Sequence, residues 1–152
     1  MIALRQGGLD DERVHALLRL HLAGMHAASP PGSVYALDLS GLQVPEVTFW
    51  SAWDGDTLLG VGALKDLGDR TGEVKSMRTA PAALRRGVAA ALLDAMLAAA
   101  RARGWVRLLL ETGTGPAFAA ANALYARYGF VPAAPFGGYT PSDFNRFFSR
   151  DL

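Results

Sequence analysis

Apolar positions in the first half of the chain predict a helix followed by a pair of strands. Behind Asp10 and Asp11, apolar residues recur at helical spacing as far as Met25, which is typical of a helix with an aspartate N-cap. The stretch "EVTFWSAWDGDTLLGVGALKDL" is rich in aromatic and β-branched residues, and its Asp54-Gly55 pair is a turn signal. We therefore expect a β-hairpin there. The intervening residues 29–44 contain two prolines and can hold one short helix, around residues 34–39.

In the second half, strand and helix patterns alternate. "GEVKSMRTAP" predicts a strand ending at Pro81, and the apolar positions that follow predict a helix that Gly104 stops. "WVRLLLET" then predicts a strand, "PAFAAANALYARYG" a helix, and the remainder a closing hairpin with a long loop. This order indicates an α/β (α+β) fold. Without an internal repeat or linker, residues 1–152 are expected to form a single domain.

Composition excludes several classes of function. With 15 basic and 14 acidic residues, the net charge of +1 does not suggest a nucleic-acid-binding surface. The absence of cysteine excludes disulfides, thiolate metal sites and a covalent thioester on the protein. The three histidines lack the His-Glu-x-x-His spacing, so no metal site is predicted. With no signal-peptide pattern and no apolar run of about 20 residues, we expect a cytoplasmic protein without a membrane partner.

A loop between a strand and a helix is the first candidate site. Arg85, Arg86 and Gly87 directly precede the alanine-rich helix. The first turn of a helix offers unpaired N–H groups and the positive end of a dipole, and glycine lets phosphate oxygens approach the main chain. The stretch has neither the Gly-x-x-x-x-Gly-Lys pattern nor Gly-x-Gly-x-x-Gly. It therefore indicates a different kind of phosphate-binding loop.

Two motifs resemble those of the GNAT superfamily of acetyl-CoA-dependent N-acetyltransferases. The family signature Gln/Arg-x-x-Gly-x-Gly/Ala is similar to "LRRGVA", where Gly87 and Ala89 fit and Leu84 replaces the usual first residue. "FAAANALYARYGF" resembles the second family motif, Asn-x-x-Ala-x-x-Leu-Tyr-x-x-x-Gly-Phe, except that Phe118 stands for the leading asparagine. The resemblance covers residues 49–130, and the two motifs have the mutual spacing of the family.

The resemblance implies a fold, a donor and a reaction. The fold is a mixed, mostly antiparallel sheet flanked by helices, with a central pair of strands that splay apart. The donor is acetyl-CoA, whose acetyl group a primary amine of a small molecule attacks directly in a ternary complex. The main chain of Met77, Arg78 and Thr79 would bind the pantetheine arm as an added strand, and the Met77 amide would stabilise the oxyanion. The residues implied for the phosphates are Leu84, Arg85, Arg86, Gly87, Val88 and Ala89.

Three residues are candidates for proton transfer. A carboxylate must accept a proton from the amine, and Glu73 is the first candidate and Glu111 the second. In the family motif, Tyr125 would donate a proton or hydrogen bond to the CoA thiolate. Each has a structural alternative, since glutamates at strand ends are commonly solvated and a tyrosine near a helix end is commonly a core ring.

The acceptor and two rival functions stay open at this point. Aromatic residues of the acceptor side suggest a partly apolar amine; they are Tyr35, Trp50, Trp53, Phe136 and Tyr139. Trp50 and Trp53 could equally fill the core. A CoA-binding sensor or subunit without turnover is one alternative function. The other is an S-adenosylmethionine-dependent methyltransferase, because "ETGTG" resembles its glycine loop, although too few residues follow for that fold. A homodimer is also left open.

Overall fold

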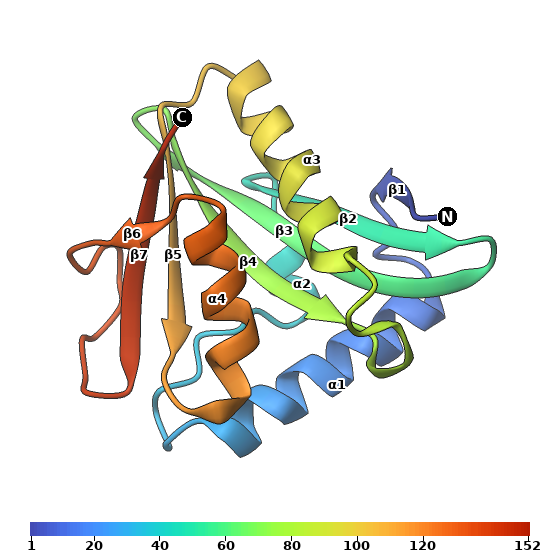
Figure 1. The fold of residues 1–152 in the computed structure, drawn as a ribbon, viewed down its shortest axis with the longest axis horizontal. Coiled ribbons are helices and arrows are strands. Elements are labelled where there is room, and N and C mark those ends of the chain that lie inside the picture. The colour runs from blue at the N-terminus through green and yellow to red at the C-terminus, as the bar shows by residue number, and fades with distance from the viewer.

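The computed structural model describes all residues, 1–152, and places seven strands in one sheet of order β1-β2-β3-β4-β5-β7-β6. The strands are β1 (Ala3–Gln6), β2 (Val47–Asp54), β3 (Thr57–Gly68), β4 (Thr71–Thr79), β5 (Arg107–Gly113), β6 (Val131–Pro132) and β7 (Asn145–Asp151). The helices are α1 (Glu12–Ala28), α2 (Leu39–Leu42), α3 (Val88–Ala102) and α4 (Ala119–Arg127), with short 3₁₀ turns η1 (Pro81–Ala83) and η2 (Pro116–Phe118). In Figure 1, α3 and α4 cover one face of the sheet, and α1 and α2 lie behind it.

Local sequence signals explain most of these boundaries. The Asp11 side chain accepts a hydrogen bond from the Arg13 amide and caps α1. Gly55 has a φ of 57° in the two-residue turn between Asp54 and Thr57, as a tight hairpin requires. Gly104, with a φ of 76°, follows the end of α3. The predicted helix 1, first hairpin, alternating second half and closing hairpin are therefore confirmed.

Two local expectations were wrong or incomplete. The short helix expected around residues 34–39 lies instead at Leu39–Leu42, because Asp38 caps it by accepting a hydrogen bond from the Gly41 amide. Strand β1 was not expected, since its four residues are all exposed and carry no alternating pattern. It pairs antiparallel with β2 and forms one edge of the sheet.

None of the helices is long and apolar enough to cross a membrane.

The two central strands β4 and β5 diverge. They are the sheet's parallel pair, and their pairing extends only over Thr71–Glu73 and 107–109. Beyond this point β5 pairs with β7 along its whole length, while β4 continues to Thr79 beside β3 alone. The edge of β4 after Glu73 therefore faces an opening rather than a neighbouring strand. This is the mostly antiparallel, splayed sheet that the resemblance implies.

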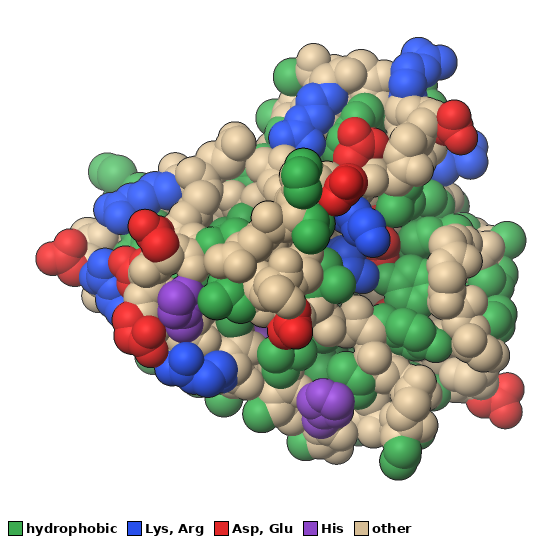
Figure 2. All heavy atoms as spheres, turned by 180° about the vertical axis from the view of Figure 1, so that it is seen from behind, with side chains coloured by type: hydrophobic (Ala, Val, Ile, Leu, Met, Phe, Trp, Pro, Cys, Tyr) green, Lys and Arg blue, Asp and Glu red, His purple; other side chains and the backbone are tan.

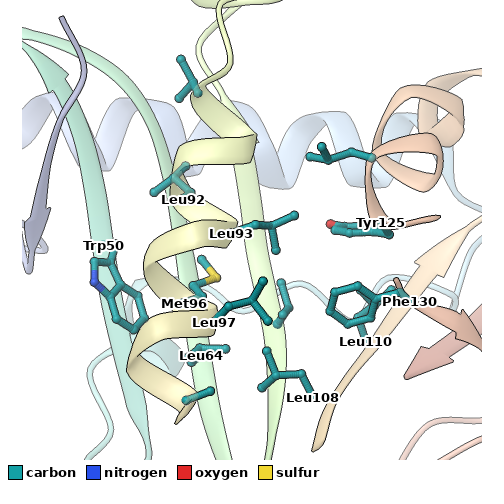
Figure 3. Packing of buried hydrophobic residues seen from close by; sticks show 14 of the residues in the cluster. Trp50, Leu64, Leu92, Leu93, Met96, Leu97, Leu108, Leu110, Tyr125 and Phe130 are labelled. Carbon is teal, nitrogen blue, oxygen red and sulfur yellow. The ribbon is translucent and has the colours of Figure 1, made fainter. Parts of the chain in front are cut away.

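Each face of the sheet carries its own apolar core. The larger cluster packs α3 and α4 on the sheet and includes Trp50, Met96 and Tyr125 (Figure 3). The smaller cluster packs α1 and α2 on the opposite face and includes Trp53 and Val61. Both tryptophans are thus core residues, which decides against a role for them in the acceptor site.

A close contact at Gly72 gives a prediction for stability. A Cβ added there would lie 2.1 Å from the ring of Trp105, which is buried. Gly72→Ala is expected to lower the free energy of unfolding by about 1–3 kcal/mol, because the rigid ring must shift. Urea unfolding would measure it. Gly138→Ala is the control, since a Cβ there meets nothing within 4 Å. Equal stability of the two variants would contradict this packing.

Candidate active site

A cavity of about 610 Å³ opens where β4 and β5 separate. Its wall combines the end of β4, the loop before α3, the last residues of β5 and one side of α4 with residues of α1 and the following loop. The cavity therefore reaches both faces of the sheet. Figure 2, which views the α1 side, shows basic and acidic side chains interspersed over this face.

The loop before α3 forms one end of the cavity. Gly87 is the N-cap of α3 in the left-handed conformation, with a φ of 79°, and no side chain caps the helix. A Cβ at Gly87 would meet nothing within 4 Å, so the main chain is open there. Arg85 also has a positive φ, 63°, and Arg86 lies 3.4 Å from Asp54. Uncapped N–H groups beside arginines fit phosphate oxygens.

The middle of the cavity is bounded by an irregular part of β4. Ser76 has a φ of 56°, and the register with β3 shifts so that Ser76 and Met77 together face Gly62. This bulge turns the main chain at the point where β4 has no neighbour on its other side. The Met77 side chain packs against the α3 core, whereas Arg78 lies against α1.

A buried polar network lies on the α1 face between β4 and the loop before β7. The Glu73 carboxylate accepts a hydrogen bond from the Tyr139 hydroxyl and lies 3.3 Å from the Lys75 ammonium. The Lys75 ammonium also donates to the Tyr139 oxygen at 2.7 Å. The Glu73 and Lys75 side chains are only 5% and 11% exposed, so neither is a solvated surface charge. The Glu73 carboxylate is therefore held by two partners.

Glu111 is the second carboxylate of the cavity, on β5. Burial raises the pKa of Glu111 to about 7; Lys75 and the Asn145 side chain act in the opposite direction, and Glu73 adds to the rise. A carboxylate with this pKa exchanges protons near neutral pH, as a general base must.

Tyr125 lines the cavity from α4. Burial raises the pKa of its hydroxyl to about 12, so the group keeps its proton at neutral pH. Its ring packs edge-to-face on Phe130, with centroids 5.8 Å apart. In Figure 3 the hydroxyl points from α4 toward α3. The residue is thus both a core ring and a residue of the cavity wall whose hydroxyl is protonated.

Comparison with known families decides what this arrangement is. Residues 14–130 match the model of the acetyltransferase (GNAT) family. The chain belongs to this family. It is an acyltransferase, and acetyl-CoA is the donor that the family implies. The methyltransferase alternative is wrong, because its doubly wound parallel sheet differs from the mostly antiparallel sheet observed.

Individual relatives agree with this GNAT assignment. The chain is 47% identical over 152 residues to the uncharacterised N-acetyltransferase YedL of Escherichia coli, covering 100% of this chain and 96% of that protein. It is 45% identical over 144 residues to the uncharacterised N-acetyltransferase YsnE of Bacillus subtilis, covering 95% of each. A Klebsiella pneumoniae structure proposed to be an acyl-CoA N-acyltransferase superposes with a TM-score of 0.84 at 28% identity, covering 100% of this chain and 98% of that one.

Most of the predicted site residues come together around the cavity. Its wall includes Glu73, Met77, Arg78, Thr79, Leu84, Arg85, Gly87, Val88, Ala89, Glu111 and Tyr125. Arg86 is not part of the wall and pairs with Asp54 instead. Of the predicted acceptor aromatics, Tyr35 and Tyr139 also line the cavity and pack edge-to-face at 4.8 Å, and Phe136 packs on Tyr139 at 5.2 Å.

Sequence reasoning missed other polar residues of this GNAT site. Lys75 could have been found, because a residue two positions from Glu73 on a strand points to the same face. Its link to Tyr139, 64 residues away, has no local signal. His21 is buried and also lines the cavity. No cluster of three or more metal-ligating side chains occurs.

Proposed function

We propose that the protein transfers the acetyl group of acetyl-CoA directly to a primary amine of a small molecule while both substrates are bound. One observation carries the proposal: a single cavity joins the open helix N-terminus at Gly87 to the half-buried carboxylate of Glu111. The chain has no cysteine that could carry the acetyl group between two half-reactions. Direct transfer in a ternary complex is therefore the reaction that we favour.

The free edge of β4 supports the proposed donor site. Acetyl-CoA supplies the thioester carbonyl as the electrophile. The main chain of Met77, Arg78 and Thr79 lies where β4 lacks a neighbour, so it can hydrogen-bond an extended chain as a new strand would. The bulge at Ser76 turns the Met77 amide, which we assign to the developing negative charge on the carbonyl oxygen. The loop Leu84–Ala89 would hold the phosphates.

Of the two candidate bases, Glu111 is the one that the structure favours. The Glu73 carboxylate is engaged by Lys75 and Tyr139, which both bind its Oε2 atom. Glu111 has a pKa of about 7 because it is desolvated. A desolvated carboxylate with this pKa is a stronger proton acceptor than an ordinary glutamate and is half ionised at neutral pH. Glu111 would accept the amine proton, directly or through water, and Glu73 would hold Lys75 and Tyr139.

Tyr125 is the group that we assign to the departing thiolate. Its hydroxyl is protonated throughout the working pH range because its pKa is raised to about 12. It lies on the α4 side of the cavity and is buried, so bulk water does not compete freely for it. A proton or hydrogen bond from Tyr125 would stabilise the sulfur as the carbon–sulfur bond breaks.

Ligand-dependent stability tests the donor site. A ligand that binds only the folded chain adds about 2.7 kcal/mol at a concentration 100 times its Kd. Acetyl-CoA is expected to raise the free energy of unfolding in this way in urea titrations, and S-adenosylmethionine is not. Gly87→Val should remove most of the stabilisation, because a branched side chain would occupy the phosphate approach and strain a φ of 79°.

The matched control is Gly104→Val at the other end of α3. Gly104 has a φ of 76° and equally open surroundings, so the backbone strain is similar. This variant should be destabilised like Gly87→Val and still gain stability from acetyl-CoA. Full stabilisation of Gly87→Val by acetyl-CoA would show that the phosphates bind elsewhere.

A further inference from the structure

Three side-chain polar atoms in the molecule are buried without a hydrogen-bond partner: His21 Nδ1, Ser76 Oγ and Arg78 Nε. All three residues line the same cavity. His21 is 5% exposed and Ser76 is 9% exposed, so water does not readily satisfy them. Buried polar atoms without partners are costly, and their concentration in one cavity indicates a polar group of a ligand.

Arg78 supplies the charge of this group of atoms. It pairs with Val61 of β3, a residue of the core between the sheet and α1, so its side chain lies on the α1 face. Its guanidinium makes only two long contacts, 3.5 Å to the Leu20 carbonyl and 3.4 Å to the His21 carbonyl. No carboxylate lies within ion-pair distance of Arg78, whereas the Lys75 ammonium is paired with Glu73.

His21 adds a polar group without adding charge. Burial, followed by the positive charge of Arg78, lowers the pKa of His21 to about 4, so the ring is neutral at physiological pH. A neutral imidazole can donate one hydrogen bond to an anion. The other unpaired cations of the wall, Arg85 and Arg127, belong to the loop before α3 and to α4, on the opposite face. On the α1 side of the cavity, Arg78 is therefore the cation without an ion-pair partner.

We propose that His21, Ser76 and Arg78 form a subsite for a carboxylate of the acceptor, which makes the acceptor a small molecule with both an amine and a carboxylate. One guanidinium with two neutral polar neighbours matches a single negative charge better than a dianionic phosphate. The amine would lie toward Glu111, farther along the same cavity. This inference rests on the proposed acetyl transfer and adds the chemical class of its acceptor.

Matched pairs of acceptors test the subsite. The probes are straight-chain ω-aminocarboxylates of increasing length and, for each, the primary amide, which keeps the amine and removes the charge. At saturating acetyl-CoA, we expect the wild-type kcat/KM to favour the acid over its amide. Arg78→Gln should reduce this acid-to-amide ratio by about 10- to 100-fold, the usual size of a lost charge-assisted hydrogen bond.

Two further variants separate the subsite from general damage. Arg78→Lys keeps the charge and loses the planar fork, so it should retain part of the preference for the acid. Arg127→Gln removes a cation from the opposite side of the same cavity and should leave the acid-to-amide ratio unchanged. An unchanged ratio in Arg78→Gln, or an equal reduction in Arg127→Gln, would overturn the proposal.

A binding measurement keeps the test independent of turnover. Titration calorimetry with the same acids and amides, on protein saturated with CoA, should show tighter binding of the acids by the wild type and loss of that preference in Arg78→Gln. This result supports the subsite even where a probe is not acetylated. Acetyl transfer to the amides with no preference for acids in either assay would overturn the subsite and leave the acetyltransferase function standing. Failure of the wild type to bind any of the acids would also overturn it.

Discussion

Tyr125→Phe is expected to lower kcat about 100-fold, the lower range for loss of a general acid, while the KM for acetyl-CoA changes little. The substitution keeps the ring that packs on Phe130 and removes the hydroxyl that faces the cavity. The hydrogen bond from the Tyr125 hydroxyl to the sulfur of CoA would strengthen only as the carbon–sulfur bond breaks. Loss of this hydrogen bond should therefore appear in kcat rather than in the affinity for acetyl-CoA. Initial-rate kinetics with the best acceptor of an amine panel would measure it.

Tyr128→Phe is the matched control for this substitution. Tyr128 follows α4 and is not part of the cavity wall; its hydroxyl bonds to the Ala90 carbonyl at 3.1 Å and to Asp94 at 2.9 Å. We expect a small loss of stability and an unchanged kcat. If chemistry is shown to be rate-limiting and kcat of Tyr125→Phe is unchanged on both sides of neutral pH, the thiolate is stabilised by another group.

Glu111→Gln is expected to lower kcat/KM by about 100-fold or more, within the range for loss of a general base. In the wild type, the raised pKa of Glu111 predicts that activity increases as the pH rises through about 7, where the carboxyl loses its proton and becomes a base. Glutamine cannot accept the proton, so this rise should disappear in the variant. A pH profile of kcat/KM from initial rates would show both effects.

The amine itself also loses a proton as the pH rises, so the profile needs a control. Two acceptors of different amine pKa separate the contributions: the rise caused by Glu111 stays near pH 7 with both, whereas the rise caused by the amine moves. Glu46→Gln, at an exposed position, should leave the profile unchanged.

Glu73→Gln tests the choice between the two carboxylates. It breaks a buried pair with Lys75, so we expect a loss of stability and a smaller fall in kcat/KM. The pH-dependent rise should be retained but moved below pH 7, because Glu73 no longer raises the pKa of Glu111. If Glu73→Gln rather than Glu111→Gln removes the rise altogether, then Glu73 is the base and our assignment is wrong.

The sequence by itself determined most of the elements and the loop that we propose for the donor. Helix α1 and the first hairpin follow from the Asp11 cap and the turn at Gly55, because these signals act between residues close together in the chain. The loop that ends at Gly87 is also local, since its glycine conformation and the uncapped helix belong to consecutive residues. Such features can be predicted from the chain because their physical causes extend over only a few residues.

Only the tertiary structure decided the acceptor end of the site. The preference for Glu111 over Glu73 depends on Lys75 and Tyr139, which meet because the loop before β7 returns to β4. The unpartnered atoms of His21, on α1, and of Arg78, on β4, share a cavity because α1 packs against β4. Burial sets the pKa of Glu111 and of His21, and pairing decides which hydrogen-bonding groups stay free. Both depend on neighbours distant in sequence, so no local pattern could reveal them.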